Sequence, residues 1–356
     1  MLETIRQDYV RTARAKGALL SHFNVLSSAR EFGKRFRLTP EDVNCVPLPM
    51  FHVFGNVLTT IGGIMYGCKT VIQSTFSART ILPLLQNERC TLMMGVPTMY
   101  CAIIAQPDFD TYELALTKGG IGGAICSPAV TKMISQRFQM PGLAVGYGLS
   151  ETAALCTLSD ITAPEEERLC SVGPPLDGVE VRVMSLTGSG EAAEGEPGEL
   201  EVRGSCVMSG YYNMPEETRA VLDGDGWLHT GDMGTRDANG CFHVIDRLKD
   251  VVIRGGENIS PSEIENVLLD MDNIYSAQCV GVRDEFYGEQ IAAFVITKDG
   301  TEMPAPQLQA YVKARLACCK VPQYVCTVDS FPTNASGKVL KRCLQKMANE
   351  RFRAGH

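Results

Sequence analysis

The sequence predicts an α/β protein in which a large domain of mixed sheets and helices precedes a small α+β domain. Short apolar runs alternate with amphipathic helical segments up to about residue 185, and two strictly alternating runs follow. New helix and strand signals start after Asp246. A chain of 356 residues is long enough for two hydrophobic cores. We therefore place the domain boundary at residues 246–250.

The large domain begins with buried strands. Residues 46–49 and 92–96 are short apolar runs that contain Gly or Pro, and residues 80–85 open a helix. Further along, residues 179–183 and 199–202 alternate apolar and polar side chains, with turn residues between the two runs. These runs predict a small antiparallel sheet.

The small domain begins with a helix whose start is marked in the sequence. Ser260 suits the N-cap, Pro261 the first turn and Glu263 a capping box. The apolar residues that recur on one face of this helix are Ile264, Val267, Leu268 and Met271. Residues 277–282 and 291–296 predict strands. A second helix then has an apolar face of Leu308, Tyr311, Val312 and Leu316.

The composition excludes several classes of protein. Apolar residues make up 45% and charged residues 21% of the chain, as in a folded globular protein. The net charge of −8 gives no electrostatic basis for nucleic-acid binding. Residues 57–66 form the longest apolar stretch and fall short of the roughly 18 residues that cross a bilayer, so we expect no transmembrane segment. The 14 cysteines are scattered without metal-ligand spacing, which argues against a zinc site and against a disulfide framework. Free thiols are typical of a reducing compartment, so we expect a cytoplasmic location.

Six motifs occur along the chain. They are residues 47–52 (PLPMFH), 122–124 (GGA), 147–152 (YGLSET), 226–232 (GWLHTGD), 246–250 (DRLKD) with 255–259 (GGENI), and 336–338 (SGK). In order and spacing they resemble the adenylate-forming acyl-CoA synthetase family, and the resemblance covers roughly residues 17–342. It implies an incomplete, truncated AMP-binding large domain over residues 18–246, a hinge at 247–250 and a mobile C-terminal AMP-binding domain over 251–356.

The resemblance also implies a two-step reaction. A carboxylate attacks the α-phosphate of ATP, which releases pyrophosphate and gives an acyl-adenylate. The thiol of coenzyme A then takes the acyl group from AMP. The substrates would be ATP, coenzyme A and a carboxylic acid, with Mg²⁺ as cofactor. Apolar residues around Phe51 and in 61–65 favour a medium- or long-chain fatty acid, but aryl-acid CoA ligases share all these motifs.

A phosphoryl group under attack gathers negative charge, which requires a nearby cation and a hard oxygen ligand for a metal. By resemblance, Lys338 on a flexible Ser-Gly segment is the lysine of the adenylation step. Glu151 matches the family position that binds Mg²⁺, an ion that prefers one or two carboxylates together with phosphate oxygens. Thr152 matches a position that contacts the AMP phosphate. Solvated surface side chains are the alternative for Lys338 and Glu151.

The adenine site is expected from two glycine-containing stretches. Tyr147, followed by Gly148, would offer an aromatic face to adenine. The backbone at Gly122, Gly123 and Ala124 would approach the edge of the base, although such residues often only form turns.

Asp232 and Arg247 are the candidate ribose ligands. The two carboxylate oxygens of Asp232 suit two vicinal hydroxyls, and Arg247 adds a fork of donors. A plain salt bridge is the alternative for both. By resemblance, Lys249 lies at the hinge about which the small domain rotates between the half-reactions. The backbone at Gly255 and Gly256 would then line the coenzyme A tunnel.

His52 lies among the apolar residues expected near the acyl pocket. It either positions the substrate carboxylate, as a catalytic residue, or packs as a core histidine. The sequence leaves both interpretations open.

Two features depart from the family pattern. The family has a phosphate loop rich in Ser, Thr and Gly, and only its tail, Lys16-Gly17 with Thr12 upstream, has a counterpart in this chain. We expect that loop and the first subdomain before it to be missing. Residues 1–17 (MLETIRQDYVRTARAKG) instead resemble the coupling loop of transporter permeases. We interpret them as an unrelated leader and the chain as a chimera, although a charged amphipathic leader helix would look similar.

Two functions follow from these observations. The first is an AMP-forming fatty acyl-CoA ligase of lipid metabolism. The second is a catalytically impaired remnant that binds AMP or coenzyme A and turns nothing over, because losing even one preorganised donor costs about 10² in rate.

Overall fold

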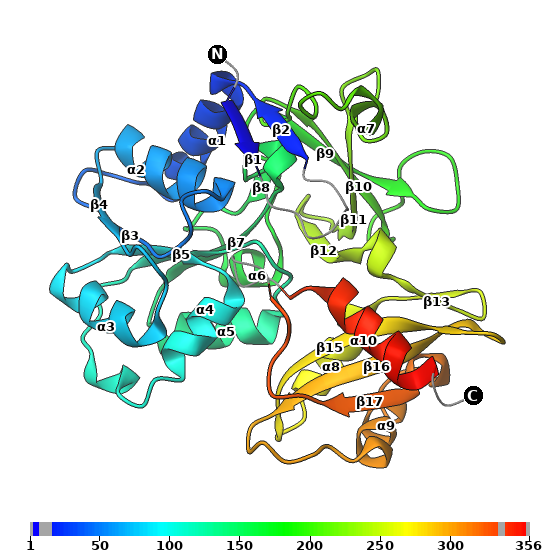
Figure 1. The fold of residues 1–356 in the computed structure, drawn as a ribbon. Coiled ribbons are helices and arrows are strands. Elements are labelled where there is room, and N and C mark those ends of the chain that lie inside the picture. Colours follow the sequence, from blue (N-terminus) through cyan, green and yellow to red (C-terminus); the bar gives the residue numbers. More distant parts are fainter. Residues whose placement is uncertain (1–2, 7–15, 334–338, 354–356) are drawn as a thin grey trace. The chain divides into compact units, whose positions relative to one another are not determined.

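The computed structural model describes residues 3–6, 16–333 and 339–353. The chain forms two compact units (Figure 1). Unit 1 comprises residues 1–230 and 234–244, and unit 2 comprises residues 231–233 and 245–356.

A six-stranded sheet forms the centre of unit 1. Its strands run in the order β4 (Lys69–Ile72), β3 (Val43–Val46), β5 (Leu92–Gly95), β6 (Lys118–Ile121), β7 (Gly142–Tyr147) and β8 (Thr157–Leu158). The first five are parallel, and β8 is antiparallel to β7. The strand predicted at 92–96 is confirmed. The strand predicted at 46–49 is wrong beyond Val46, because Pro47 and Pro49 cannot donate to a ladder.

Helices cover both faces of this sheet. They are α1 (His22–Arg35), the π-helix η1 (Phe54–Ile61), α2 (Gly62–Met65), α3 (Ala78–Asn87), α4 (Pro97–Ile104), η2 (Phe109–Thr111), α5 (Pro128–Arg137), η3 (Ser150–Thr152) and α6 (Glu165–Cys170). Leu92 and Met94 of β5 belong to one core with Phe32 of α1, and Met93 belongs to another core with Leu82 of α3. Figure 1 accordingly shows α1 and α2 on one side of the sheet and α3 to α5 on the other.

A second sheet has the strand order β12 (Phe242–Arg247), β11 (Leu228–Arg236), β10 (Gly198–Gly204) and β9 (Val179–Ser185). Strands β9 and β10 pair antiparallel, as their alternation predicts. A short helix, α7 (Pro215–Arg219), precedes β11. Strand β1 (Glu3–Arg6) pairs antiparallel with β2 (Gly17–Leu20), so residues 3–6 form a strand and not the alternative leader helix.

Unit 2 is built on a five-stranded sheet. Its order is β14 (Glu257–Ile259), β13 (Val252–Arg254), β16 (Gly288–Thr297) and β15 (Ile274–Asp284), with β17 (Tyr324–Thr327) parallel to β16. Its helices are η4 (Leu248–Asp250), α8 (Pro261–Leu269), α9 (Ala305–Lys313), η5 (Cys318–Lys320) and α10 (Lys341–Arg353). On β15, Cys279 packs with the core of α8 and α9, and Val280 packs with that of α10. The predicted helices and strands are confirmed, except that Met271 lies beyond the end of α8 and Leu316 lies beyond the end of α9.

The part of the chain that the structure describes contains no helix with the length and apolar character needed to cross a bilayer. The cysteines are all free thiols.

Candidate nucleotide-binding site

The two glycine-containing stretches of unit 1 meet at the carboxyl edge of the central sheet. Strands β6 and β7 are parallel neighbours, with Ile121 opposite Val145, so the residues after both strands lie side by side. A Cβ added to Gly122 would lie 3.3 Å from the carbonyl oxygen of Gly146, and Gly123 has a φ of +76°. Ligands of open α/β sheets bind at this edge. The structure therefore places residues 122–124 beside the end of β7, which carries Tyr147, while their role in binding adenine stays a prediction.

Tyr147 and Gly148 are held by the chain that follows them. The carbonyl group of Tyr147 accepts a hydrogen bond from the N–H of Cys156 at 2.9 Å, and the tyrosine is largely buried. A Cβ on Gly148 would overlap the carbonyl group of Ala154 and lie 2.6 Å from Cα of Leu155. Gly148 is thus required by close backbone packing, a reason that the motif alone does not indicate.

Two alanines after this loop adopt left-handed backbone conformations, with φ of +47° for Ala153 and +83° for Ala154. Such conformations are unfavourable for residues other than glycine and cluster at functional sites. Sequence reasoning missed this feature, because nothing in an Ala-Ala pair signals it.

The hydroxyl groups of the loop differ in their partners. Oγ1 of Thr152 accepts from the N–H of Leu149 at 2.8 Å and donates to its carbonyl group at 3.2 Å, so it serves the turn of η3. Oγ of Ser150 is buried and has no hydrogen-bond partner among the described residues. Buried polar groups are normally paired, so an unpaired hydroxyl here is typical of a place where a ligand supplies the partner.

Glu151 is partly exposed, and only one of its carboxylate oxygens is engaged by the described residues. Oε1 accepts a hydrogen bond from the hydroxyl of Tyr211 at 2.8 Å. Oε2 has no such partner within the described part of the chain. A carboxylate with one oxygen that accepts no hydrogen bond from the described residues suits Mg²⁺, so Glu151 fits the predicted ion.

His52 lies between β3 and η1. The Nδ1 atom of its ring accepts from the backbone N–H of Phe54 at 3.2 Å, and its backbone N–H donates to the carbonyl group of Pro49 at 3.0 Å. The contact with Phe54 gives the ring a local structural role, while its catalytic role stays a prediction. The π-helix η1 was not predicted; in it, the hydroxyls of Thr59 and Thr60 both donate to the carbonyl group of Gly55. Segments of π-helix often occur at functional sites.

The two predicted ribose ligands lie together in unit 2. Oδ1 of Asp232 is 2.6 Å from Nε of Arg247, and Asp232 is buried. This geometry contains the salt bridge that the sequence left as an alternative. The ribose role of both residues stays a prediction.

Asp246 fixes the start of α8. Its Oδ2 accepts from the hydroxyl of Ser260 at 2.9 Å and from the N–H of Ser262 at 3.0 Å. Its Oδ1 accepts from the N–H of Arg247 at 2.9 Å. Ser260 is the N-cap residue of α8, as predicted, with Pro261 in the first turn. Its hydroxyl turns to Asp246, however, and Asp246 accepts from the helix N–H in its place.

The hinge and coenzyme A candidates have clear local positions. Lys249 lies in η4. Gly255 and Gly256 form the two-residue turn between β13 and β14, and their φ values are +60° and +88°. Such a turn needs positive φ at both positions, which explains both glycines without a ligand. Their predicted contact with coenzyme A stays a prediction.

Lys338 lies outside the described residues. On either side of its segment, Thr333 and Val339 pair as an antiparallel bridge. A second lysine, Lys341, is largely buried, with Nζ 2.8 Å from Oε1 of Glu265. Burial raises the pKa of Glu265 and opposes the charge on Lys341, but the attraction of Glu265 and Asp246 outweighs that effect and raises the pKa of Lys341. The carboxylate of Asp246 repels the carboxylate of Glu265 and attracts the ammonium group of Lys341.

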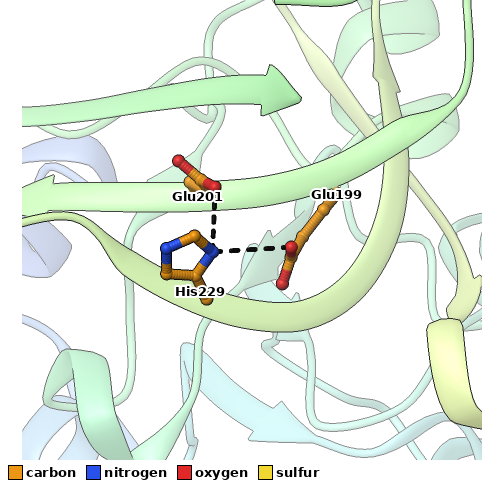
Figure 2. Close-up of side chains that lie close together, drawn as sticks. All are labelled: Glu199, Glu201 and His229. Carbon is orange, nitrogen blue, oxygen red and sulfur yellow. Dashed lines mark ion pairs between the residues drawn. The ribbon is translucent and has the colours of Figure 1, made fainter. Parts of the chain in front are cut away.

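A separate charged cluster lies on the small sheet. Glu199 and Glu201 of β10 point toward His229 of β11 (Figure 2). Nδ1 of His229 is 2.9 Å from Oε1 of Glu201 and 3.5 Å from Oε2 of Glu199. Oε2 of Glu201 is 2.6 Å from Arg182, whose guanidinium group stacks on Trp227. Because a cation already neutralises Glu201, we interpret the cluster as an ion-pair network between strands.

Comparison with known protein families matches both units. The AMP-binding enzyme family matches residues 12–212, which is more than half of the chain, and its C-terminal domain matches residues 263–338. The chain belongs to the AMP-binding enzyme family. The recognition of this family from six motifs is therefore confirmed.

Relatives of this chain are acyl-CoA synthetases. YngI of Bacillus subtilis, provisionally named as one, is 37% identical over 342 residues, which are 96% of this chain and 62% of YngI. The human mitochondrial medium-chain acyl-CoA ligase ACSF2 is 35% identical over 336 residues, which are 93% of this chain and 55% of ACSF2. The chain thus spans less than two thirds of the length of these relatives.

A solved structure confirms the predicted fold class. ATP-bound MatB from Rhodopseudomonas palustris matches with a TM-score of 0.90 and 30% identity, over 98% of this chain and 68% of MatB. The fold is that of the adenylate-forming enzymes, with an α/β large domain and a small C-terminal domain.

Proposed function

We propose that this AMP-binding enzyme is an ATP-dependent acyl-CoA ligase for a medium- or long-chain fatty acid. The observation that carries the proposal is the loop after β7. There, one carboxylate oxygen of Glu151 and the buried hydroxyl of Ser150 have no hydrogen-bond partner among the described residues. Both groups lie at the sheet edge where parallel α/β folds bind ligands.

The roles follow from the chemistry of each group. Glu151 would hold Mg²⁺, which neutralises charge on the phosphate oxygens of ATP. Lys338 would bring an ammonium group to the oxygens that gain charge as the substrate carboxylate attacks the α-phosphate and pyrophosphate leaves. Asp232 would accept hydrogen bonds from the ribose hydroxyls, with Arg247 beside it.

The second step would use a different arrangement. The small domain would turn about Lys249, so that the backbone near Gly255 and Gly256 faces the pantetheine arm of coenzyme A. The thiol sulfur would then bond to the acyl carbon as AMP leaves.

The substrate class rests on apolar surroundings. Val57 and Leu58 of η1, which follow His52 in the sequence, are buried, as expected near an alkyl chain. The ligase ACSF2 is named for medium-chain acids, which supports the same class. Free cysteines suit a reducing compartment, so we propose a cytoplasmic location.

An ATP–pyrophosphate exchange assay over fatty acids of increasing length, with benzoate as the aryl alternative, tests the proposal. We expect exchange with fatty acids and a drop of about 10² or more in Lys338→Ala. The same variant should still form thioester from supplied acyl-AMP and coenzyme A. Exchange that does not depend on Lys338 would contradict the assignment.

A binding remnant is the second candidate, because the phosphate loop of the family has only its Lys16-Gly17 tail here. In that case calorimetry would detect AMP binding that Asp232→Ala abolishes, while exchange would be absent with every acid.

A further inference from the structure

We propose that Tyr211 is a positioning residue, which fixes one oxygen of the Glu151 carboxylate and leaves the other for a divalent cation. The inference rests on the proposed function, because that function assigns the cation to Glu151. No motif pointed to Tyr211; it lies some 60 residues further along the chain, and only the fold brings the two side chains together.

The contact is short, partly buried and reinforced by the backbone. The hydroxyl of Tyr211 donates to Oε1 of Glu151 at 2.8 Å, and only 9% of the tyrosine is exposed. The N–H of Met208 donates to the carbonyl group of Glu151, also at 2.8 Å. The segment around Tyr211 therefore holds both the main chain and the side chain of Glu151.

Tyr211 is itself anchored on both sides. Its N–H donates to Oγ1 of Thr218 at 2.9 Å, and it forms a bridge with Ala18 of β2. The next residue, Tyr212, donates its N–H to the carbonyl group of Gly17 at 2.8 Å. With its backbone fixed, a tyrosine has two side-chain torsions left, and burial restricts both. The hydroxyl therefore stays where Glu151 meets it.

Lys16 supports the contact electrostatically. Its Nζ lies 4.9 Å from the centre of the Tyr211 ring. A cation near the ring face is attracted to it, and it polarises the phenol so that the hydroxyl becomes a better donor to a carboxylate. Lys16, which corresponds to the tail of the family's phosphate loop, thus acts on Glu151 through the ring of Tyr211.

The occupied oxygen has a consequence for which ion binds. With Oε1 already accepting the tyrosine hydrogen bond, Oε2 is the oxygen that Glu151 offers more readily to a cation, which favours the monodentate mode. Mg²⁺ requires a near-octahedral shell and accepts single oxygens, whereas Ca²⁺ is larger and commonly takes both oxygens of a carboxylate. We therefore expect Tyr211 both to strengthen Mg²⁺ binding and to disfavour Ca²⁺.

The test removes the hydroxyl and keeps the ring. In the full chain with ATP, the Mn²⁺ affinity of the ternary complex is measured by electron paramagnetic resonance, and Mg²⁺ and Ca²⁺ are compared by competition. The variants are Tyr211→Phe, Glu151→Gln and Tyr212→Phe, a matched control in the exposed neighbouring tyrosine. Melting temperatures check that each variant is folded.

For Tyr211→Phe we expect Mg²⁺ to bind about tenfold more weakly and the preference for Mg²⁺ over Ca²⁺ to fall by a similar factor, as for other residues that orient metal ligands. Tyr212→Phe should match the unsubstituted protein. Wild-type affinity and preference in Tyr211→Phe, with weakened binding in Glu151→Gln, would overturn the inference alone. An unchanged cation affinity in Glu151→Gln, or no ATP complex in the unsubstituted protein, would overturn the proposed role of Glu151 and the inference with it.

Discussion

The loop after β7 in unit 1 and the segment from residue 245 to α8 in unit 2 both carry family motifs, but different forces hold them. In the loop, uncharged groups set the geometry: Gly148 packs on the backbone of Ala154, and the hydroxyl of Thr152 bonds to Leu149. In the segment, buried charges do so, with Asp246 at the start of α8 and Lys341 against Glu265. The stability of the loop should therefore depend on side-chain volume, whereas the stability of the segment should depend on side-chain charge and on pH.

The largest expected effect tests the loop. Gly148→Ala would place a methyl group into the backbone of Ala154 and Leu155, which only a backbone shift can relieve. We expect a loss of about 3 kcal/mol or more in unfolding free energy, measured by urea denaturation. Gly224→Ala is the control, because a Cβ at Gly224 meets nothing within 4 Å and should cost less than about 0.5 kcal/mol. Equal stability of the two variants would contradict the packing argument.

The next effect tests the segment. Lys341→Met would leave Glu265 buried without its cation and should cost about 3 kcal/mol at pH 7.5. Because burial raises the pKa of Glu265 in the folded state, its contribution to stability is present at low pH and is lost as pH rises. The cost should therefore shrink as pH falls from 7.5 to 5, because protonation removes the buried charge of Glu265 that needs a partner.

Urea denaturation at both pH values measures this difference. Lys346→Met in the same helix is the matched control, since the ion pair of Lys346 with Glu350 is exposed and should be worth less than about 1 kcal/mol. A cost of Lys341→Met that does not depend on pH would argue against buried charge as the organising force of the segment.

The smallest expected effect concerns the charged cluster of the small sheet. His229→Gln keeps a polar side chain but loses the contacts to Glu199 and Glu201, which should lower stability by about 0.5–1 kcal/mol. If Arg182 already neutralises Glu201, then added Zn²⁺ should leave the melting temperature unchanged. A rise with Zn²⁺ in the unsubstituted protein that is absent in His229→Gln would show a metal site instead.

The sequence predicts helices and strands whose patterns depend on neighbouring residues. It does not predict side-chain contacts between residues that are distant in the sequence. The continuous apolar run at 92–96 is a strand because a strand buried on both faces has only apolar side chains. The alternating runs at 179–183 and 199–202 are strands because burial of one face selects an apolar residue at every second position. Ser260 is the N-cap residue, as predicted, but its side chain does not cap the helix, because Asp246, 14 residues earlier, takes its hydroxyl. Motif spacing likewise made Glu151 a candidate metal ligand but could not point to Tyr211, whose contact with Glu151 depends on tertiary structure.

Residue type alone also did not show the local reason why certain glycines are present. Gly148, Gly255 and Gly256 fit ligand-binding motifs, yet backbone packing and a tight hairpin turn explain them. The sequence shows that a glycine is there, and only the surrounding backbone shows which demand it meets.

The π-helix η1 gives the region near His52 an unusual tolerance in length. A π-turn holds one residue more than an α-turn, so deleting a single residue between Phe54 and Ile61 would restore regular α-helical spacing. Side chains before the deletion would then turn by about 100° relative to those after it. A one-codon change could thus reshape the wall beside His52 while the central sheet keeps its register.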